Sequence, residues 1–203
     1  MEERPPGPRA GTALVGRLLQ HAAGIALAAT TRVNLEDMMD RCCGFEVRSA
    51  ALYRNFAAGA RDQPDLCALW TAMAREEDDH ARIINDARRR LPTIDAWMTQ
   101  LSTRWDEVVR QAEEKLSRAE RLGGGAGADK QLIAALELEM TEIAPLRQML
   151  VAVSHRHPPP PITENHALRL ADAAERFSAL PEVRRQAALL RTRARPPGRD
   201  SRA

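Results

Sequence analysis

A glutamate and a histidine three residues apart, Glu77 and His80, are the residues of this sequence best suited to chemistry. In a helix, positions i and i+3 lie on the same face, so the two side chains would point the same way. The other residues at helical spacing on that face are Leu66, Trp70, Met73, Ala74, Ala81 and Ile84. Burying an unpaired carboxylate among apolar side chains is costly, so the pair needs a compensating partner. A metal ion is one such partner, because carboxylate oxygens and imidazole nitrogens both ligate metals.

Two more glutamates, Glu46 and Glu139, lie on apolar faces of other predicted helices. The face of Glu46 carries Met39, Cys42, Cys43, Ser49, Ala50, Tyr53 and Ala57, and that of Glu139 carries Leu132, Ala135, Leu136, Glu142, Ile143 and Leu146. Inward carboxylates on separate helices, together with one imidazole, favour a metal site inside a helical protein. Glu142 is a further candidate ligand that could instead pair with an inward arginine. Tyr53 is either a core residue or a hydrogen-bond donor to a ligand.

The helices that must position these residues are predicted from apolar periodicity, caps and breakers. Asn34 is suited to cap the helix of Glu46, and Pro64 is suited to begin the helix of Glu77. The run Gly123-Gly124-Gly125 separates a long helix without an inward carboxylate from the helix of Glu139. The predicted helices cover residues 34–60, 64–90, 93–122, 128–154, 163–177 and 181–193. The sequence therefore predicts an all-α protein.

Composition excludes several classes of function. The chain has 203 residues, enough for one domain with tails, and only 3% aromatic residues, which favours helix over strand. A net charge of +2 provides no strong field for nucleic acid or for an anionic membrane. The cysteines, Cys42, Cys43 and Cys67, do not form a disulfide framework and favour a reducing compartment. No apolar run is long enough to span a bilayer, so this and the charge and cysteines together predict a cytoplasmic protein without membrane or nucleic-acid partners.

The sequence resembles the ferritin-like, rubrerythrin-type diiron-carboxylate proteins over about residues 34–178. The resemblance lies in Glu46 with Tyr53 seven residues on, in Ala74-Arg75-Glu76-Glu77-x-x-His80-Ala81, and in Ala134-Ala135-Leu136-Glu137-Leu138-Glu139. It implies a ferritin-like four-helix bundle in which residues 93–122 form a long extra crossover helix. A partly disordered extension, residues 1–33, would precede the bundle. A C-terminal helix and a disordered tail, residues 179–203, would follow it.

The resemblance also implies a role for each matching residue. Glu46 and Glu139 would be single carboxylate ligands, Glu77 would bridge two irons, and His80 would ligate one of them. The cofactor would be one or two ions of iron, or of manganese, with open positions for dioxygen or peroxide. The implied function is iron binding with oxidation of ferrous iron, in a ferroxidase- or peroxidase-type reaction. A homodimer is a further expectation from the family.

The sequence departs from the family because it lacks a second Glu-x-x-His on the fourth bundle helix. The best match is Asp172-Ala173-Ala174-Glu175, in which Glu175 would replace the histidine and give a carboxylate-rich half-site. Periodicity argues against this match, since Leu170 and Phe177 mark the apolar face and Asp172 lies almost opposite it. We interpret His155, His157 and His166 as surface histidines beside a proline-rich loop, with a peripheral metal site there as the alternative.

The missing motif leaves a second interpretation open. The chain would then be a non-catalytic helical scaffold or an interaction protein that has kept the fold and lost the metal. Glu46, Glu77 and His80 would form a buried hydrogen-bonded cluster, and the chain would not be an enzyme. Cys42 and Cys43 are interpreted as small apolar residues rather than redox groups. No glycine-rich phosphate loop or nucleophile–base motif is present in the sequence.

Overall fold

The computed structural model describes residues 39–89, 97–153 and 162–194, and every regular element in these ranges is an α-helix. The helices are one over residues 39–59, α2 (Pro64–Arg88), α3 (Trp97–Glu120), α4 (Ala128–Val153), α5 (Ile162–Phe177) and α6 (Pro181–Ala194). For residues 97–106, 108–109, 142–153 and 162–165 only the backbone is described. The prediction of an all-α chain is confirmed for the described part of the chain.

Proline and glycine determine where the helices begin and end. Pro64 is the first residue of α2, a position where its missing N–H costs no helical hydrogen bond. Gly123, three residues after the end of α3, adopts a φ of 66°, a left-handed conformation that favours glycine. The predicted boundaries of α2, α4, α5 and α6 therefore agree with the structure to within two residues at each end. The predicted residues 34–38 of the first helix lie outside the described residues.

The backbone of the loop between α3 and α4 closely approaches the backbone of the 39–59 helix. A Cβ atom added to Gly59 would lie 1.6 Å from the carbonyl oxygen of Gly124, and one added to Gly124 would lie 2.4 Å from that of Asn55. Only glycine permits so close an approach. This contact fixes the end of the 39–59 helix against the start of α4, and so sets how the inward faces of these two helices meet.

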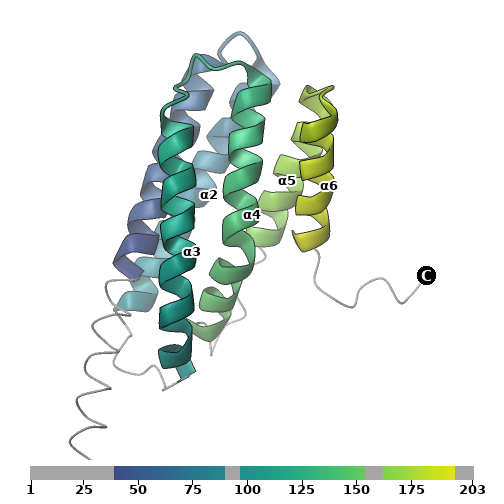
Figure 1. The fold of residues 1–203 in the computed structure, drawn as a ribbon. Helices are drawn as coiled ribbons and strands as arrows, with labels where there is room; N and C mark the ends of the chain where they lie inside the picture. Colours follow the sequence, from purple (N-terminus) through teal and green to yellow (C-terminus); the bar gives the residue numbers. More distant parts are fainter. Residues whose placement is uncertain (1–38, 90–96, 154–161, 195–203) are drawn as a thin grey trace, which may run out of the picture.

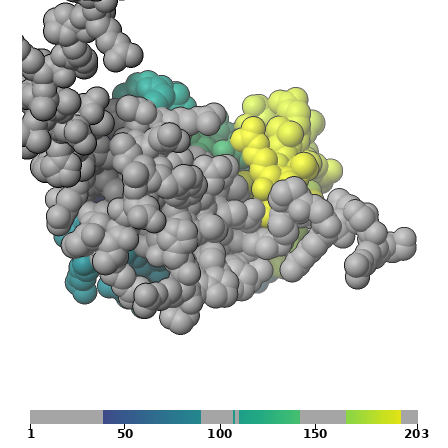
Figure 2. Space-filling view, turned by 90° about the horizontal axis from the view of Figure 1, so that it is seen from below, coloured from purple at the N-terminus to yellow at the C-terminus, as the bar shows by residue number. Residues whose placement is uncertain are grey.

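The helices run alongside one another (Figure 1), and α6, yellow in both views, lies at one edge of the molecule (Figures 1 and 2). α3 packs on α4, α4 on α5 and α6, and α5 on both α2 and α6. α3 also contacts the 39–59 helix, because Arg41 pairs with Glu113 at 3.0 Å and Arg48 with Glu120 at 2.7 Å. α3 therefore covers the outside of the 39–59 helix and α4, away from α5.

The core runs through all of these helices. Its largest fully buried side chains include Trp70, Tyr53, Phe56, Leu116, Leu132 and Leu170. Each such side chain contributes about 1.5–3 kcal/mol by leaving water. None of the described helices is long and apolar enough to cross a membrane. The predicted extension, residues 1–33, and the tail after residue 194 lie outside the described residues.

Candidate metal centre

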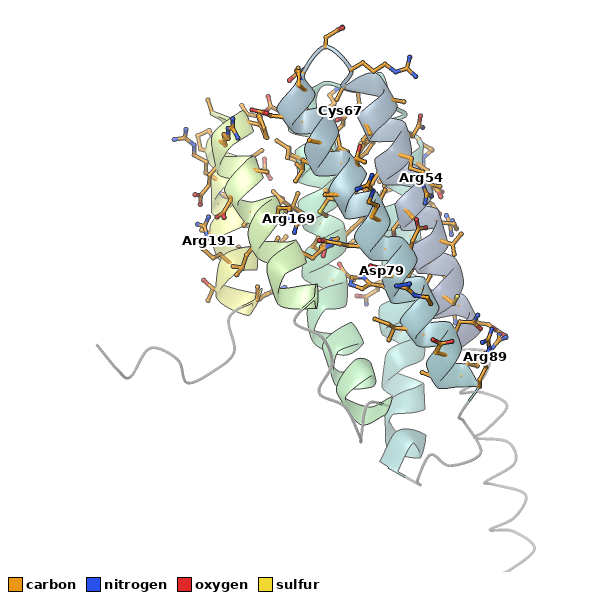
Figure 3. All side chains as sticks on the ribbon, turned by 180° about the vertical axis from the view of Figure 1, so that it is seen from behind. Arg54, Cys67, Asp79, Arg89, Arg169 and Arg191 are labelled. Carbon is orange, nitrogen blue, oxygen red and sulfur yellow. The ribbon has the colours of Figure 1, made fainter. Side chains whose placement is uncertain are left out.

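Five ionisable side chains are buried together in the core. They are Glu46 from the 39–59 helix, Glu77 and His80 from α2, Glu139 from α4 and His166 from α5. None is more than 5% exposed. Figure 3 shows why these helices can share one site, since α2 lies between the 39–59 helix and α5, with α4 behind them. Four helices therefore place acidic and imidazole groups at one point in an apolar interior.

One half of the cluster is built around His80. Its Nδ1 lies 2.9 Å from Oε2 of Glu77 and 3.5 Å from Oε2 of Glu46. The ligand atoms of these three residues lie within 4.8 Å of one another. Burial alone would lower the pKa of His80, but the neighbouring carboxylates of Glu46 and Glu77 raise it to about 10. In the protein without metal, these two carboxylates therefore favour the protonated form of the imidazole.

The other half of the cluster is built around His166. Its Nε2 lies 2.7 Å from Oε1 of Glu139 and 3.4 Å from Oε1 of Glu77. The ligand atoms of these three residues also lie within 4.8 Å of one another. Burial would lower the pKa of His166, but the charges of Glu139 and Glu77 raise it well above its ordinary value. Glu77 thus belongs to both halves, with Oε2 facing His80 and Oε1 facing His166.

Two residues outside the cluster hold the His166 half in place. The hydroxyl of Tyr53 donates a hydrogen bond of 3.3 Å to Oε1 of Glu139. Tyr53 is itself held by a stacked contact with Trp70, whose ring centre is 5.7 Å away. On the other side, Nδ1 of His166 lies 2.7 Å from Oε2 of Glu76. The structure therefore favours the second of the two roles predicted for Tyr53, that of a hydrogen-bond donor to a candidate ligand.

The His80 half contains polar atoms without such support. Oε2 of Glu46 and Nε2 of His80 are buried and have no hydrogen-bond partner among the described residues. Leaving a buried polar atom unpaired costs about 1–3 kcal/mol, and more where the group is charged. The charge of Glu77 is also poorly compensated, because burial raises its pKa to about 8 even though the nearby His166 lowers it. A cation between these residues would satisfy the carboxylate oxygens that the protein leaves unpaired.

The structure brings together four of the residues predicted as ligands: Glu46, Glu77, His80 and Glu139. It does not bring Asp172 and Glu175 to the cluster. Both carboxylates bind Arg191 of α6 at 2.6 Å, and the side chain of Asp172 is 71% exposed. The reason is helical geometry, since six residues from His166 rotate Asp172 by about 240° around α5. The side chain of Glu142 lies outside the described residues, so its role as a ligand stays a prediction.

His166 is the ligand candidate that the sequence interpretation missed. We expected a surface histidine beside a proline-rich loop, but His166 is only 1% exposed. A signal was present in the sequence, because His166 lies four residues before Leu170 and eight before Ala174 on the apolar face of α5. The expectation of a surface residue is therefore wrong, and the second imidazole of the cluster comes from this position. His155 and His157 lie outside the described residues.

The cysteines are not part of the cluster. All three are free, and Cys42 is buried. Burial, with a further contribution from the charge of Glu46, raises the pKa of the Cys42 thiol to about 12. Cys43 donates from Sγ to the carbonyl oxygen of Ala81 at 3.6 Å. A thiol that stays protonated is a poor nucleophile and a poor metal ligand. This fits the predicted role of Cys42 as a small apolar residue.

Comparisons of this chain with protein-family models, with curated proteins and with solved structures found no match. The interpretation of the cluster therefore depends on its own geometry. That geometry is two overlapping groups, Glu46–Glu77–His80 and Glu77–Glu139–His166, either of which could hold a metal ion. Carboxylate and imidazole ligands in a dry interior can bind a divalent ion and can leave coordination positions for a small molecule.

Proposed function

We propose that this protein is a ferritin-like, rubrerythrin-type protein that binds two metal ions, with iron as the leading candidate. The observation that supports this most strongly is the position of Glu77. One oxygen of Glu77 faces His80 of its own helix, and the other faces His166 of α5. Glu46 and Glu139 complete the two sides. A single carboxylate shared by two ligand groups is the arrangement that a bridging ligand between two ions requires.

The distances within each group support the proposal. Metal–oxygen and metal–nitrogen bonds are about 2.1 Å, so two ligands at right angles on one ion lie about 3.0 Å apart. The separations from the histidine nitrogens to the carboxylate oxygens are 2.9 and 3.5 Å in the His80 half and 2.7 and 3.4 Å in the His166 half. Each half therefore needs only small side-chain movements to become a coordination sphere.

Charge supports the proposal as well. The cluster holds Glu46, Glu77 and Glu139, all buried, and several kcal/mol is the usual penalty for each ion taken out of water. Without metal, two protonated histidines offset the charges of two carboxylates, and the raised pKa of Glu77 favours its neutral form, yet unpaired atoms remain in the His80 half. Two divalent ions with neutral histidines would more than offset the charges of the three carboxylates. The cluster is therefore better satisfied with metal than with protons.

Ligand chemistry favours iron or manganese, since imidazole and carboxylate together suit both ions. When bound, iron would supply one-electron transfer to dioxygen or peroxide, which is the basis for proposing a ferroxidase- or peroxidase-type oxidoreductase. The chain itself would bind and orient the ions through Glu46, Glu77, His80, Glu139 and His166. Tyr53, which is fully buried and bonded to Glu139, and Trp70, which stacks on Tyr53, would exclude water from this side of the cluster.

One observation favours the alternative, a scaffold that has kept the cluster without metal. Each histidine already lies within hydrogen-bond distance of a carboxylate, 2.9 Å for His80 and 2.7 Å for His166. Protonated histidines could therefore hold the helices together without an ion. Under this alternative the melting temperature would not change on removal or addition of metal, whereas binding to the folded state alone must raise it.

Anaerobic titration with ferrous iron tests the proposal. We expect purified protein, stripped with chelator, to bind about two equivalents per chain and to melt at a higher temperature with iron than without it. The matched control is Asp79→Ala, because Asp79 is an acidic residue of α2 that pairs with Arg82 at the surface. This variant should bind iron like the wild type. Binding of less than one equivalent by the wild type, with no change in melting temperature, would refute the proposal.

A further inference from the structure

The two histidines of the cluster face the carboxylates with different nitrogens. His80 presents Nδ1, and its Nε2 has no hydrogen-bond partner among the described residues. His166 presents Nε2, and its Nδ1 lies 2.7 Å from a carboxylate oxygen of Glu76. A neutral imidazole carries one proton, and the nitrogen that binds a metal must be the bare one. His80 and His166 would therefore bind metal in opposite tautomers.

Glu76 connects His166 to the surface of the protein. Its Oε2 faces Nδ1 of His166, and its Oε1 forms an ion pair with Arg169, which Figure 3 labels on α5 beside α2. Consecutive residues of a helix point about 100° apart. Glu77 therefore points into the core while Glu76 points toward α5. The Glu76 side chain is 19% exposed and that of His166 only 1%, so Glu76 contacts a buried group from the edge of the core.

We propose that Glu76 is a positioning residue for the half of the metal centre that contains His166. The proposal rests on the metal function proposed above. By accepting the Nδ1 proton of His166, the Glu76 carboxylate selects the tautomer with a bare Nε2 and fixes the plane of the ring. Carboxylates that hold a ligating histidine in this way raise metal affinity by roughly ten- to a hundredfold. Two adjacent glutamates of α2 would thus have different roles: Glu77 would bind metal, and Glu76 would orient His166, a ligand from α5.

A purely structural role for Glu76 makes a different prediction. If Glu76 only joined α2 to α5 through its ion pair with Arg169, Glu76→Gln, which loses that ion pair, should weaken the His166 half as much as Glu76→Ala does. If it positions His166, its loss should weaken only the ion bound by Glu77, Glu139 and His166. The ion bound by Glu46, Glu77 and His80 should keep its affinity, because no described contact joins Glu76 to Glu46 or His80.

Zinc titration of four proteins separates these roles: the wild type, Glu76→Ala, Glu76→Gln and Asp78→Asn. Zinc replaces iron because it does not change oxidation state. In Glu76→Ala, the affinity for one of the two zinc ions should fall by roughly ten- to a hundredfold, and the affinity for the other should stay the same. Glu76→Gln should weaken the same equivalent less, because the glutamine carbonyl still accepts the Nδ1 proton. Asp78→Asn is the matched control, since Asp78 lies on α2 and pairs with Arg54; it should titrate like the wild type.

The tautomers give a readout that a structural role would not change. In zinc-loaded protein with 15N-labelled histidine, His166 should carry its proton on Nδ1 and His80 on Nε2. His166→Gln and His80→Gln assign the two sets of signals, and circular dichroism of each variant checks that it folds. An Nε2 proton on His166 in the loaded wild type would overturn the proposal.

If Glu76→Ala lowered the affinity for both zinc ions equally, or for neither, the proposed role of Glu76 would also be overturned. The two proposals fail in different ways. A wild type that binds neither zinc nor iron refutes the metal function, and the role of Glu76 falls with it. A wild type that binds two equivalents, with a Glu76→Ala variant that titrates identically, refutes only the role of Glu76.

Discussion

The two halves of the cluster share Glu77 but differ in how firmly they are held. In the His166 half, Tyr53 binds Glu139 and Glu76 binds the second nitrogen of the imidazole. In the His80 half, an oxygen of Glu46 and the second nitrogen of His80 have no hydrogen-bond partner among the described residues. The His166 half is organised before metal binds, whereas the unpaired atoms of the His80 half would gain their polar contacts from the metal. Preorganisation lowers the cost of binding, so we expect the His166 half to bind first and more tightly.

The largest effect should come from the residue that the two halves share. Glu77→Gln removes the charge but keeps the shape, so we expect both equivalents of metal to be lost. The metal-free variant should be as stable as the wild type or more stable, because burial disfavours the charge that is removed. Metal analysis and thermal melts of the stripped protein measure the two effects. Asp79→Asn serves as the control, and retention of both equivalents by Glu77→Gln would contradict the shared-ligand account.

Replacing the histidines one at a time should separate the halves. His166→Ala should remove the tighter equivalent, and His80→Ala should remove the weaker one, since each variant deletes one imidazole and leaves the shared Glu77. Calorimetric titration with zinc resolves the two steps. If His80→Ala removed the tighter equivalent instead, the order deduced from the hydrogen bonds of Glu76 and Tyr53 would be wrong.

Stability should depend on pH in opposite ways with and without metal. Without metal, the pKa of Glu77 rises from 4.5 to about 8 and that of His80 from 6.5 to about 10. Because the folded state holds these protons more tightly than the unfolded state, their contribution is full at low pH and is lost as pH rises through the folded pKa values. Metal must displace the same protons, so the gain in melting temperature on adding ferrous iron should grow with pH.

Melts at pH 6 and pH 8, with and without anaerobic ferrous iron, measure both trends. We expect the stripped protein to melt lower at pH 8 and the iron-dependent increase to be larger there. Glu77→Gln provides the control, because it should lose the iron-dependent increase at both pH values. A metal-dependent increase that shrinks as pH rises would contradict proton displacement from the cluster.

The smallest effect should come from the tyrosine that supports the His166 half. Tyr53→Phe removes one hydrogen bond of 3.3 Å and keeps the stacked contact with Trp70, so we expect a loss of about 1 kcal/mol or less. Denaturant unfolding of the stripped protein measures this loss. In a zinc titration the tighter equivalent should weaken by a few-fold while the weaker one stays the same. If Tyr53→Phe instead lowered the affinity of the His80 half, the support that Tyr53 and Glu76 provide would not be confined to the His166 half.

How much of this site the sequence predicts depends on the surroundings of each residue. Glu46, Glu77 and Glu139 each interrupt a long apolar face, and a charge in such a face is visible at helical spacing. His166 lies near the start of α5, five residues after a proline-rich loop, and the loop outweighed its spacing to Leu170 in our interpretation. Asp172 was proposed from motif spacing against the periodicity of its own helix, and the structure follows the periodicity.

The fold shows the same division between local and long-range information. Pro64 and Gly123 act locally, so the helix boundaries near them were predicted closely. Which helices pack against one another depends on contacts between distant residues, such as that between Gly59 and Gly124, which no local pattern records. The ion pairs of Arg191 with Asp172 and Glu175 are of this kind as well. They explain why two acidic residues that fit a ligand motif by spacing lie at the surface.

The most direct test of the central claim is anomalous scattering at the iron edge from crystals of the protein loaded with ferrous iron under anaerobic conditions. The account predicts two peaks in the core, one beside Glu46 and His80, the other beside Glu139 and His166, with Glu77 between them. Crystals of iron-loaded protein with no peak among these five residues would contradict it.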